Sequence, residues 1–389
     1  MFQHDLGIQL YFYIQKFTFH RLGIDLTTKT GRVNRPYFLG LVVFALATIH
    51  IPMVVYSKNN LQDIAQVTNA MAPAMQGSIT LFKIWQTISK RKEMSQLVQD
   101  IYLMSTKASK QELRILLSEN NREHFMNTAY YYSVLNTGIL AMIAPVLVGF
   151  IQYIRLGNFS YIMVLRGSYP IQHDQPLNYF LIWIWSAFAI YGVIYGSVSV
   201  DTIYSWYIHN IVGNFKILQS KLASAEFITD LSERRDMIYS CVHYHQRLIA
   251  TADQLELIYR PIIFVEFSLN TLQICFLAYQ IGSGVVAAVD LSFLFLFITS
   301  VGIQLMIYCY GGQHLQNESG QISISIYKTI NSPAWPIPLR KVLLLAMMRA
   351  QKSCKLTGIF FDVDLRSFLW VWRTAGSYVT LLRSVEQGM

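Results

Sequence analysis

The sequence predicts an all-α membrane protein with seven transmembrane helices. Of its 389 residues, 53% are hydrophobic and 14% are charged, whereas a soluble domain has about 25% charged residues. The mean hydropathy of +0.35 agrees with this class. A helix needs about 20 mostly apolar residues to cross a bilayer. Seven segments approach this length: residues 37–56, 70–88, 129–154, 177–200, 261–281, 290–310 and 363–384.

Two of these segments and the N-terminal region carry additional information. Lys83 makes 70–88 the weakest candidate, and Arg366 and Arg373 make the last segment poorly suited to face lipid. Residues 1–36 contain no apolar core with a cleavage site, so no signal peptide is expected. The aromatic-rich stretch from Leu6 to Phe19 predicts either an interfacial or re-entrant helix or a plain amphipathic tail.

The positions of lysine and arginine predict the orientation of the chain. The N-terminal segment and the alternate loops on its side hold 24 of the 31 lysines and arginines, against three in the loops on the other side. We therefore expect a cytoplasmic N-terminus and an extracellular C-terminus. The net charge of +9 reflects this bias and not a nucleic-acid partner, because no nucleic-acid-binding motif is present. The glycosylation sequon at Asn158 falls in a predicted external loop, which agrees.

This topology divides the chain into six parts. In 213–260, apolar or small residues recur about every 3.5 residues from Ile238 to Tyr259, so spans four and five should continue below the membrane as a bundle. The parts are an interfacial N-terminal segment (1–36), spans one to four with extracellular loop 155–176 (37–212), a cytoplasmic helical region (213–260), spans five and six (261–310), a cytoplasmic anchor helix region (311–361), and the last span with a short extracellular tail (362–389).

The last span carries a polar stripe. Arg373, Ser377, Thr380 and Ser384 are spaced four, three and four residues apart, so they share one helix face. Such a stripe is either a hydrogen-bonded seam between helices or the wall of a water-filled path. Asp362 and Asp364, just before it, are expected to cap the helix.

The outer halves of the spans suggest an apolar pocket for a small ligand. Aromatic and methionine side chains suit apolar molecules, and tyrosine hydroxyls can orient a polar group; ordinary helix packing would use the same residue types. The candidates are Met75, Ser78, Met142, Val146, Phe150, Tyr153, Tyr179, Trp183, Ala187, Tyr191, Phe276 and Phe297.

The sequence gives no sign of an enzyme. It has no glycine-rich phosphate loop, no metal-binding constellation and no pair of carboxylates on one intramembrane face, so no catalytic residue, metal or cofactor is expected. Glu266, after Pro261 at the expected start of span five, should pair with a nearby basic residue near the inner interface.

About 65 residues at the C-terminus carry a more specific pattern. It consists of Trp335, Arg340-Lys341, Met347 to Lys352, Leu356-Thr357-Gly358, Phe360-Phe361, Leu365, Phe368, Thr374, Ser377-Tyr378 and Thr380-Leu381-Leu382. This pattern resembles the C-terminal signature of insect odorant receptors. Two positions depart from it: Ser353-Cys354 stands where the family often has proline, and Gly376 where it commonly has tyrosine.

The resemblance implies a ligand-gated, non-selective cation channel in the plasma membrane of olfactory neuron dendrites. In that family an odour-binding subunit forms a heterotetramer with a common co-receptor, and cytoplasmic helices join the subunits. A small volatile organic ligand binds among spans two to six. This chain lacks the co-receptor's long insertion between spans four and five, which implies a tuning subunit. The last span lines the pore, here with Arg373, Ser377, Thr380, Leu381 and Ser384.

Three alternatives remain at this point. A gustatory receptor would resemble a different ending, a Thr-Tyr pair followed by apolar residues and Gln-Phe, which is absent. A G-protein-coupled receptor would need the opposite topology and the Asp/Glu-Arg-Tyr and Asn-Pro-x-x-Tyr switches. A transporter would show inverted repeats with broken helices.

Overall fold

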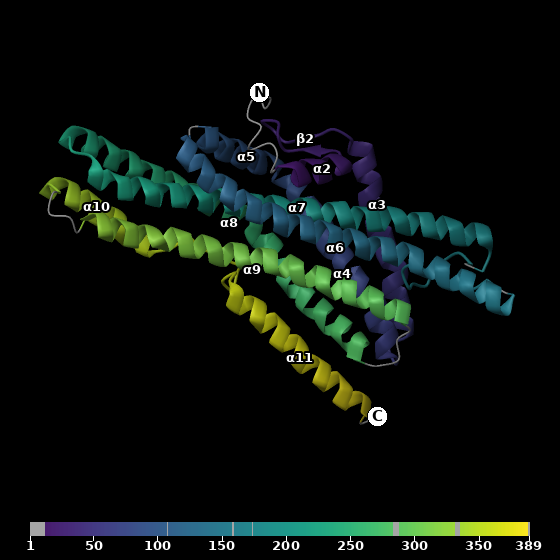
Figure 1. The fold of residues 1–389 in the computed structure, drawn as a ribbon. Coiled ribbons are helices and arrows are strands. Elements are labelled where there is room, and N and C mark those ends of the chain that lie inside the picture. The colour runs from purple at the N-terminus through teal and green to yellow at the C-terminus, as the bar shows by residue number, and fades with distance from the viewer. Residues whose placement is uncertain are drawn as a thin grey trace.

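The computed structural model describes residues 12–106, 108–157, 159–172, 174–282, 288–330 and 335–387, and these are mainly helical (Figure 1). A short hairpin pairs Ile24 with Val33. The elements are α2 (Tyr13–Leu22), β1 (Ile24–Asp25), β2 (Arg32–Val33), α3 (Pro36–Asn59), α4 (Ile64–Ser89), α5 (Arg91–Thr106), α6 (Lys110–Leu156), α7 (Pro176–Ser224), η1 (Ala225–Phe227), α8 (Leu231–Gly282), α9 (Ala288–Ile330), α10 (Ile337–Gln351) and α11 (Leu365–Gln387).

Four long helices form the body of the molecule. Helices α6, α7, α8 and α9 have 47, 49, 52 and 43 residues, about twice the length that a bilayer requires. Each is therefore longer than one membrane crossing, and α7 and α8 run on past the residues predicted for spans four and five; that these extensions lie on the cytoplasmic side stays a prediction. In Figure 1 they run side by side, α10 packs at one end, and α11 diverges from the bundle. Pro261, at the expected start of span five, lies inside α8, so the helix runs through it.

The chain is a multi-pass membrane protein. In the part of the chain that the structure describes, α3, α6, α7, α8 and α9 are long and apolar enough to cross a membrane. Helices α4 and α11 correspond to the other two predicted spans and carry the charged residues Lys83, Arg366 and Arg373. These two helices are not among the five that are apolar enough to cross a membrane on their own. Their place in the membrane therefore depends on contacts with other helices or subunits.

Helix α7 forms the centre of the bundle. Every residue from Gly196 to Phe215 is buried, as expected for a helix covered on all sides. The helices α2, α3, α4, α6, α8 and α9 all pack against it. A charged side chain in this stretch has no route to solvent, so Asp201 requires buried partners.

The N-terminal helix α2 also packs on α7 and is not a free tail. The helix buries Ile14, Phe19 and Leu22. The ring of Phe12, the residue before the helix, meets the ring of Trp206 edge-on, with centroids 4.9 Å apart. The helix ends at Gly23, whose φ of 78° is left-handed. The earlier part of the predicted 6–19 helix, up to residue 11, lies outside the described residues.

Candidate ligand cavity and pore helix

A cavity of about 100 Å³ lies between α3, α4, α6, α7 and α9. Its walls are largely apolar, with a few hydroxyl, amide and imidazole groups. The lining residues are Leu46, Ile49, His50, Met53, Pro73, Ala74, Gln76, Gly77, Tyr130, Val134, Thr137, Gly138, Ala141, Leu165, Ala189, Ile190, Val193, Ile194, Phe293, Phe297, Ser300, Val301 and Gln304.

The loop between α6 and α7 covers part of this cavity. Leu165 is a lining residue, and its carbonyl accepts a 2.8 Å hydrogen bond from the hydroxyl of Tyr169. The backbone N–H of Ser168 donates to the carbonyl of Pro52 in α3 at 2.9 Å. The loop is thus attached to the helix bundle close to the cavity. Asn158, the predicted glycosylation site in this loop, lies outside the described residues.

Two polar residues connect the cavity to the charged centre of the bundle. Tyr130 and Gln304 both line the cavity. The hydroxyl of Tyr130 and the amide of Gln304 donate to Oδ2 of Asp201 at 2.7 and 2.8 Å. A ligand that displaced either side chain would therefore change the surroundings of a buried carboxylate.

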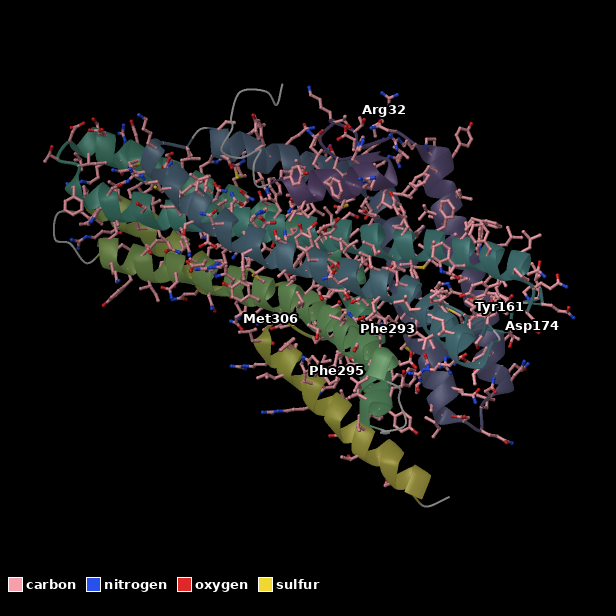
Figure 2. The ribbon with its side chains drawn as sticks, turned by 45° about the vertical axis from the view of Figure 1, so that its right-hand side comes forward. Arg32, Tyr161, Asp174, Phe293, Phe295 and Met306 are labelled. Atoms are coloured by element: carbon pink, nitrogen blue, oxygen red, sulfur yellow. The ribbon has the colours of Figure 1, made fainter. Side chains whose placement is uncertain are left out.

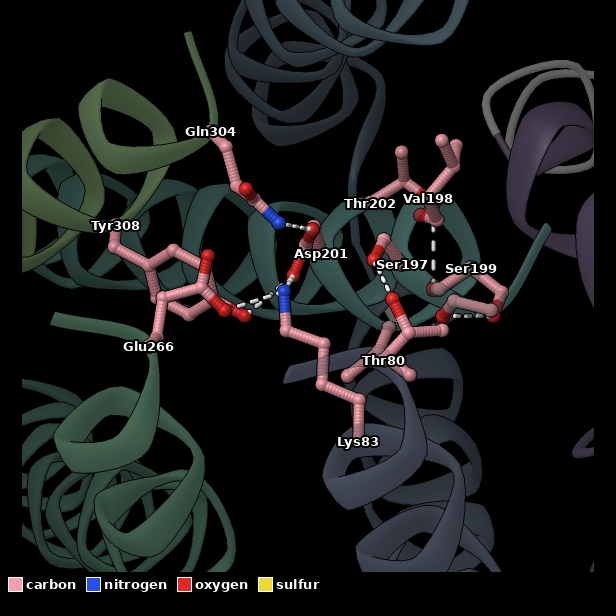
Figure 3. Close-up of polar contacts among 12 residues, drawn as sticks. Thr80, Lys83, Ser197, Val198, Ser199, Asp201, Thr202, Glu266, Gln304 and Tyr308 are labelled. Atoms are coloured by element: carbon pink, nitrogen blue, oxygen red, sulfur yellow. Dashed lines mark hydrogen bonds and ion pairs between the residues drawn. The ribbon is translucent and has the colours of Figure 1, made fainter. Parts of the chain in front are cut away.

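Asp201 belongs to a buried ion network (Figure 3). The ammonium of Lys83 lies 2.6 Å from Oδ1 of Asp201 and 2.5 Å from Oε2 of Glu266. The hydroxyl of Tyr308 also donates to Oδ1 of Asp201, at 2.6 Å, and Asn270 donates to Glu266 at 2.9 Å. This Lys83–Asp201–Glu266 network ties together α4, α7, α8 and α9.

The network confirms one prediction and reveals a residue that sequence reasoning missed. Glu266 pairs with a basic residue as expected, and the partner is Lys83. Asp201 was not among the predicted functional residues. Asp201 directly follows the predicted span 177–200. A carboxylate at such a position is normally paired with another polar group, so its place in the sequence could have indicated a buried partner.

Of the predicted ligand residues, the structure places Phe297 in the cavity lining. Its ring contacts that of Phe293, with centroids 5.6 Å apart. Along α6 the cavity is lined by residues 130–141, whereas the predicted residues lie at 142–153; along α7 it is lined by residues 189–194, whereas the predicted residues lie at 179–191. The remaining candidates lie elsewhere, and their roles stay predictions: half-buried Met75, Ser78, Met142, Trp183, Ala187, Tyr191 and Phe276, buried Tyr179, and exposed Val146, Phe150 and Tyr153.

Hydrogen bonds and ring contacts explain several of these placements. The indole N–H of Trp183 donates to the carbonyl of Met142 at 3.3 Å, so these two residues brace α6 against α7. The hydroxyl of Tyr179 donates to the carbonyl of Ile162 in the covering loop. The hydroxyl of Tyr191 donates to the carbonyl of Arg21, towards the N-terminal hairpin.

The predicted pore residues form an exposed face of α11. Arg373, Ser377, Thr380, Leu381 and Ser384 are all exposed in the single chain, while the opposite face buries Val371 and Ala375. The hydroxyls of Ser377 and Thr380 donate to backbone carbonyls of their own helix. Among the described residues, the stripe is therefore not a hydrogen-bonded seam to another helix of the chain.

The segment before α11 is held tightly against the bundle. Asp364 accepts a 2.8 Å hydrogen bond from the backbone N–H of Ser367, which confirms the predicted cap. Asp362 instead forms an ion pair with Lys355 at 2.6 Å. The ring of Phe361 lies 5.0 Å from that of Phe267, which directly follows Glu266 of the buried network in α8.

Comparisons with known proteins agree with this architecture. A profile of the family described as 7tm Odorant receptor matches residues 63–376. Odorant receptor 45a of Drosophila melanogaster is 30% identical over 380 residues, covering 97% of this chain and 99% of the relative. Odorant receptor 47a of the same species is 28% identical, covering 95% and 98%.

Solved structures share the fold. The insect olfactory receptor OR5 from Machilis hrabei, solved in complex with eugenol, aligns with a TM-score of 0.80 and 15% identity. The alignment covers 98% of this chain and 100% of that one. The structure of the same receptor described without eugenol aligns with a TM-score of 0.77.

Proposed function

The chain belongs to the 7tm odorant receptor family, and from this premise we propose that it is the odorant-binding subunit of a heteromeric, ligand-gated, non-selective cation channel. Membership makes it an odorant-sensing, multi-pass membrane receptor. One observation supports the proposal of a ligand-gated channel. Tyr130 and Gln304 connect the apolar cavity to a buried ion network that includes Glu266 of α8. Helix α8 in turn packs on α11.

The cavity favours a small organic ligand with one polar group. Most of its wall is aliphatic or aromatic. The hydroxyl of Ser300 lies 2.7 Å from that of Ser133 and 3.0 Å from that of Thr137, which gives the wall one compact hydroxyl cluster. Apolar pockets with a few placed polar groups are typical of small-molecule sites. The Machilis hrabei relative is described in complex with eugenol, and we expect a volatile ligand of similar character here.

We propose that the ligand acts by shifting a population of closed and open states. A ligand opens the channel only if it binds the open state more tightly than the closed state. The path from the cavity would run through Asp201 and Glu266 to α8, whose Phe267 contacts Phe361 just before α11. A movement of α8 would then displace the start of α11.

Two exposed surfaces support assembly with further subunits, which we take to include the odorant co-receptor. The polar face of α11 is uncovered in the single chain. Helix α10 exposes Leu344, Leu345 and Met348, which is more apolar surface than a helix outside the bilayer normally leaves in water. In this proposal the assembly lies in the plasma membrane of olfactory neuron dendrites, with α11 lining the pore and α10 joining subunits.

Whole-cell recording tests this proposal. Cells would express the full chain alone or with an insect odorant co-receptor, and an odorant panel would be applied after surface labelling has verified delivery. Rapid cation current only in the co-expressing cells would support the tuning-subunit role. Current from the chain alone would instead identify a self-sufficient channel of the gustatory type.

A further inference from the structure

A groove separate from the ligand cavity lies where the N-terminal hairpin meets α3 and the α4–α5 junction. It has a volume of about 670 Å³ and is open on one side. Two kinds of residue line it, cationic ones at one end and apolar ones along α3. The lining residues are Thr30, Gly31, Arg32, Val33, Pro36, Leu39, Gly40, Val43, Ile88, Arg91 and Lys92.

The cationic end of the groove is formed by Arg32, Arg91 and Lys92. Within the described part of the chain, Arg32, Arg91 and Lys92 form no ion pair with a carboxylate. Two acidic side chains stand nearby: Glu93, next to Lys92, is paired with Lys90 at 3.1 Å, and Asp25, opposite Arg32 in the hairpin, accepts hydrogen bonds from Thr27. Arg91 uses one N–H to donate to the carbonyl of Ile88, which leaves the rest of its guanidinium free for an anion.

The hairpin and α5 are fixed together, so the cations do not meet by chance. Gly31 has a φ of 59°, and a Cβ at this position would lie 2.6 Å from the carbonyl oxygen of Arg91. The hydroxyl of Ser95 also donates to the carbonyl of Thr28 in the hairpin. Only glycine fits both the backbone conformation and this close approach, and the contact sets Arg32 beside Arg91.

The apolar end runs along α3, where Pro36 and Gly40 are exposed, Val43 is half-buried and Leu39 is buried. Leu41 and Phe44, on neighbouring positions of α3, are exposed, as expected for side chains in contact with lipid. Two aromatic residues mark the level of the membrane surface: Tyr37 is 93% exposed and Trp85 is 59% exposed. Tyrosine and tryptophan gather where the hydrocarbon meets the headgroups, and on this basis we expect the three cations at headgroup level. Arg32 points away from the helix bundle (Figure 2).

We propose that this groove binds one anionic phospholipid of the cytoplasmic leaflet. The phosphate and acidic headgroup would accept hydrogen bonds from Arg32, Arg91 and Lys92, and an acyl chain would lie against Pro36, Gly40 and Val43. The choice of leaflet follows from the charge bias of the loops. A zwitterionic lipid would leave the excess positive charge of the groove unbalanced, so the site should prefer phosphatidylserine to phosphatidylcholine.

Native mass spectrometry of the purified full chain with a mixture of dioleoylphosphatidylserine and dioleoylphosphatidylcholine tests the site. Each removed cation should weaken anionic lipid binding about fivefold. The double variant Arg32→Gln/Arg91→Gln should therefore lose about 25-fold in retained phosphatidylserine. The matched variant Arg235→Gln/Lys341→Gln, which removes the same charge elsewhere, should retain it.

A second variant blocks the groove without changing its charge. A Cβ at Gly40 would meet nothing within 4 Å, so Gly40→Phe can fold while filling the path of the acyl chain. It should release phosphatidylserine, whereas Gly40→Ala should keep it. Unchanged binding in Gly40→Phe, or equal loss in the Arg235/Lys341 control, would overturn the proposal. Displacement of the lipid by inorganic phosphate as effectively as by phosphatidylserine would identify an anion site and would also overturn it.

Discussion

The carboxylate of Asp201 is surrounded by donors on both oxygens. Lys83 and Tyr308 contact Oδ1, and Tyr130 and Gln304 donate to Oδ2. Burying a charge costs several kcal/mol unless partners of good geometry replace its water. These contacts explain how α4 can carry a lysine at its centre: Lys83 is 1% exposed and turns inward, away from lipid.

Replacing Lys83 by methionine should destabilise the fold. Asp201 and Glu266 would then share one buried site without a cation, and breaking a buried pair in this way costs about 3–5 kcal/mol. Thermal unfolding of the purified chain and its yield at the cell surface would measure the loss. The triple variant Lys83→Met/Asp201→Asn/Glu266→Gln should recover part of it, because no charge remains buried. Wild-type stability in the single variant would contradict this account.

Filling the cavity should remove the response to larger odorants. Val134→Phe adds volume to a space of about 100 Å³, so the concentration for half-maximal current should rise about tenfold or more, equivalent to about 1.4 kcal/mol. Concentration–response curves would measure it. Ile143→Phe, on the exposed side of the same helix, is the matched control. Equal tuning in both variants would place the ligand elsewhere.

Sequence reasoning identified the kind of site better than its depth. It predicted an apolar pocket among spans two to six and included Phe297, which lines the cavity, but the cavity is also lined by α3, the first span, and by no residue of α8, the fifth. It did not select Tyr130, Gln304 or Asp201. Residue type indicates which side chains suit a ligand, but the level at which several helices leave a space depends on how they pack against one another. That level is not encoded in any local pattern.

At the scale of elements, α9 and the segment before α11 touch backbone to backbone. A Cβ on Gly312 would lie 2.1 Å from the carbonyl oxygen of Val363, well inside van der Waals contact. Even the smallest side chain at this position would push the start of α11 away from α9. The coupling between the bundle and the predicted pore helix therefore depends on this glycine.

Gly312→Ala should reduce the maximal odorant-evoked current several-fold, because the start of α11 must move. Surface expression should change less than current. Gly320→Ala on the same helix is the control, since its Cβ would make an ordinary 3.8 Å contact with Ser353. Recordings normalised to surface labelling would separate gating from delivery, and a normal current in Gly312→Ala would remove this contact from the gating path.

The helical region that we predict to be cytoplasmic should weaken in acid. Burial, together with the nearby positive charge of Arg349, lowers the pKa of His245 to about 4, below its unfolded value of about 6.5. The folded state then binds fewer protons, so its stability is complete above pH 6.5 and is lost as the pH falls towards 4. At pH 5 the loss should reach about 2 kcal/mol.

Hydrogen exchange of α8 and α10 at pH 7.5 and pH 5 would measure this effect. His245→Gln removes the titrating group, so it should flatten the pH dependence of exchange around residue 245 while leaving exchange in α3 unchanged. A pH dependence of the same size in His245→Gln would assign the effect to another group.

The long helices were more predictable than their ends. The repeat of about 3.5 residues from Ile238 to Tyr259 correctly indicated a helix that continues beyond span five. Pro261 stands at the expected start of span five, and the helix continues through it. Packing of α8 against α4 and α11 outweighs the one backbone hydrogen bond that proline removes.

At the scale of the whole molecule, composition predicted the fold class, because hydropathy summed over a span does not depend on packing detail. Helices α4 and α11 are the exceptions. Their charges are tolerated for different reasons: Lys83 is buried in an ion network, and Arg373 lies on the uncovered face of α11. A sequence average cannot distinguish a buried charge from one that faces a further subunit.

Orientation remains a prediction, and it determines where each proposed site would act. With 24 of 31 lysines and arginines on the side of the N-terminus, we expect an N-terminal epitope tag to be labelled only after permeabilisation and a C-terminal tag to be labelled on intact cells. The chain has a second sequon, Asn317-Glu318-Ser319, on the predicted cytoplasmic side. Asn158→Gln should therefore remove a glycosidase-sensitive mobility shift, whereas Asn317→Gln should not. The reverse labelling pattern would move the lipid groove to the outer leaflet and the ligand cavity to the inner half of the membrane. An odorant arriving from outside would then have to cross the bilayer first.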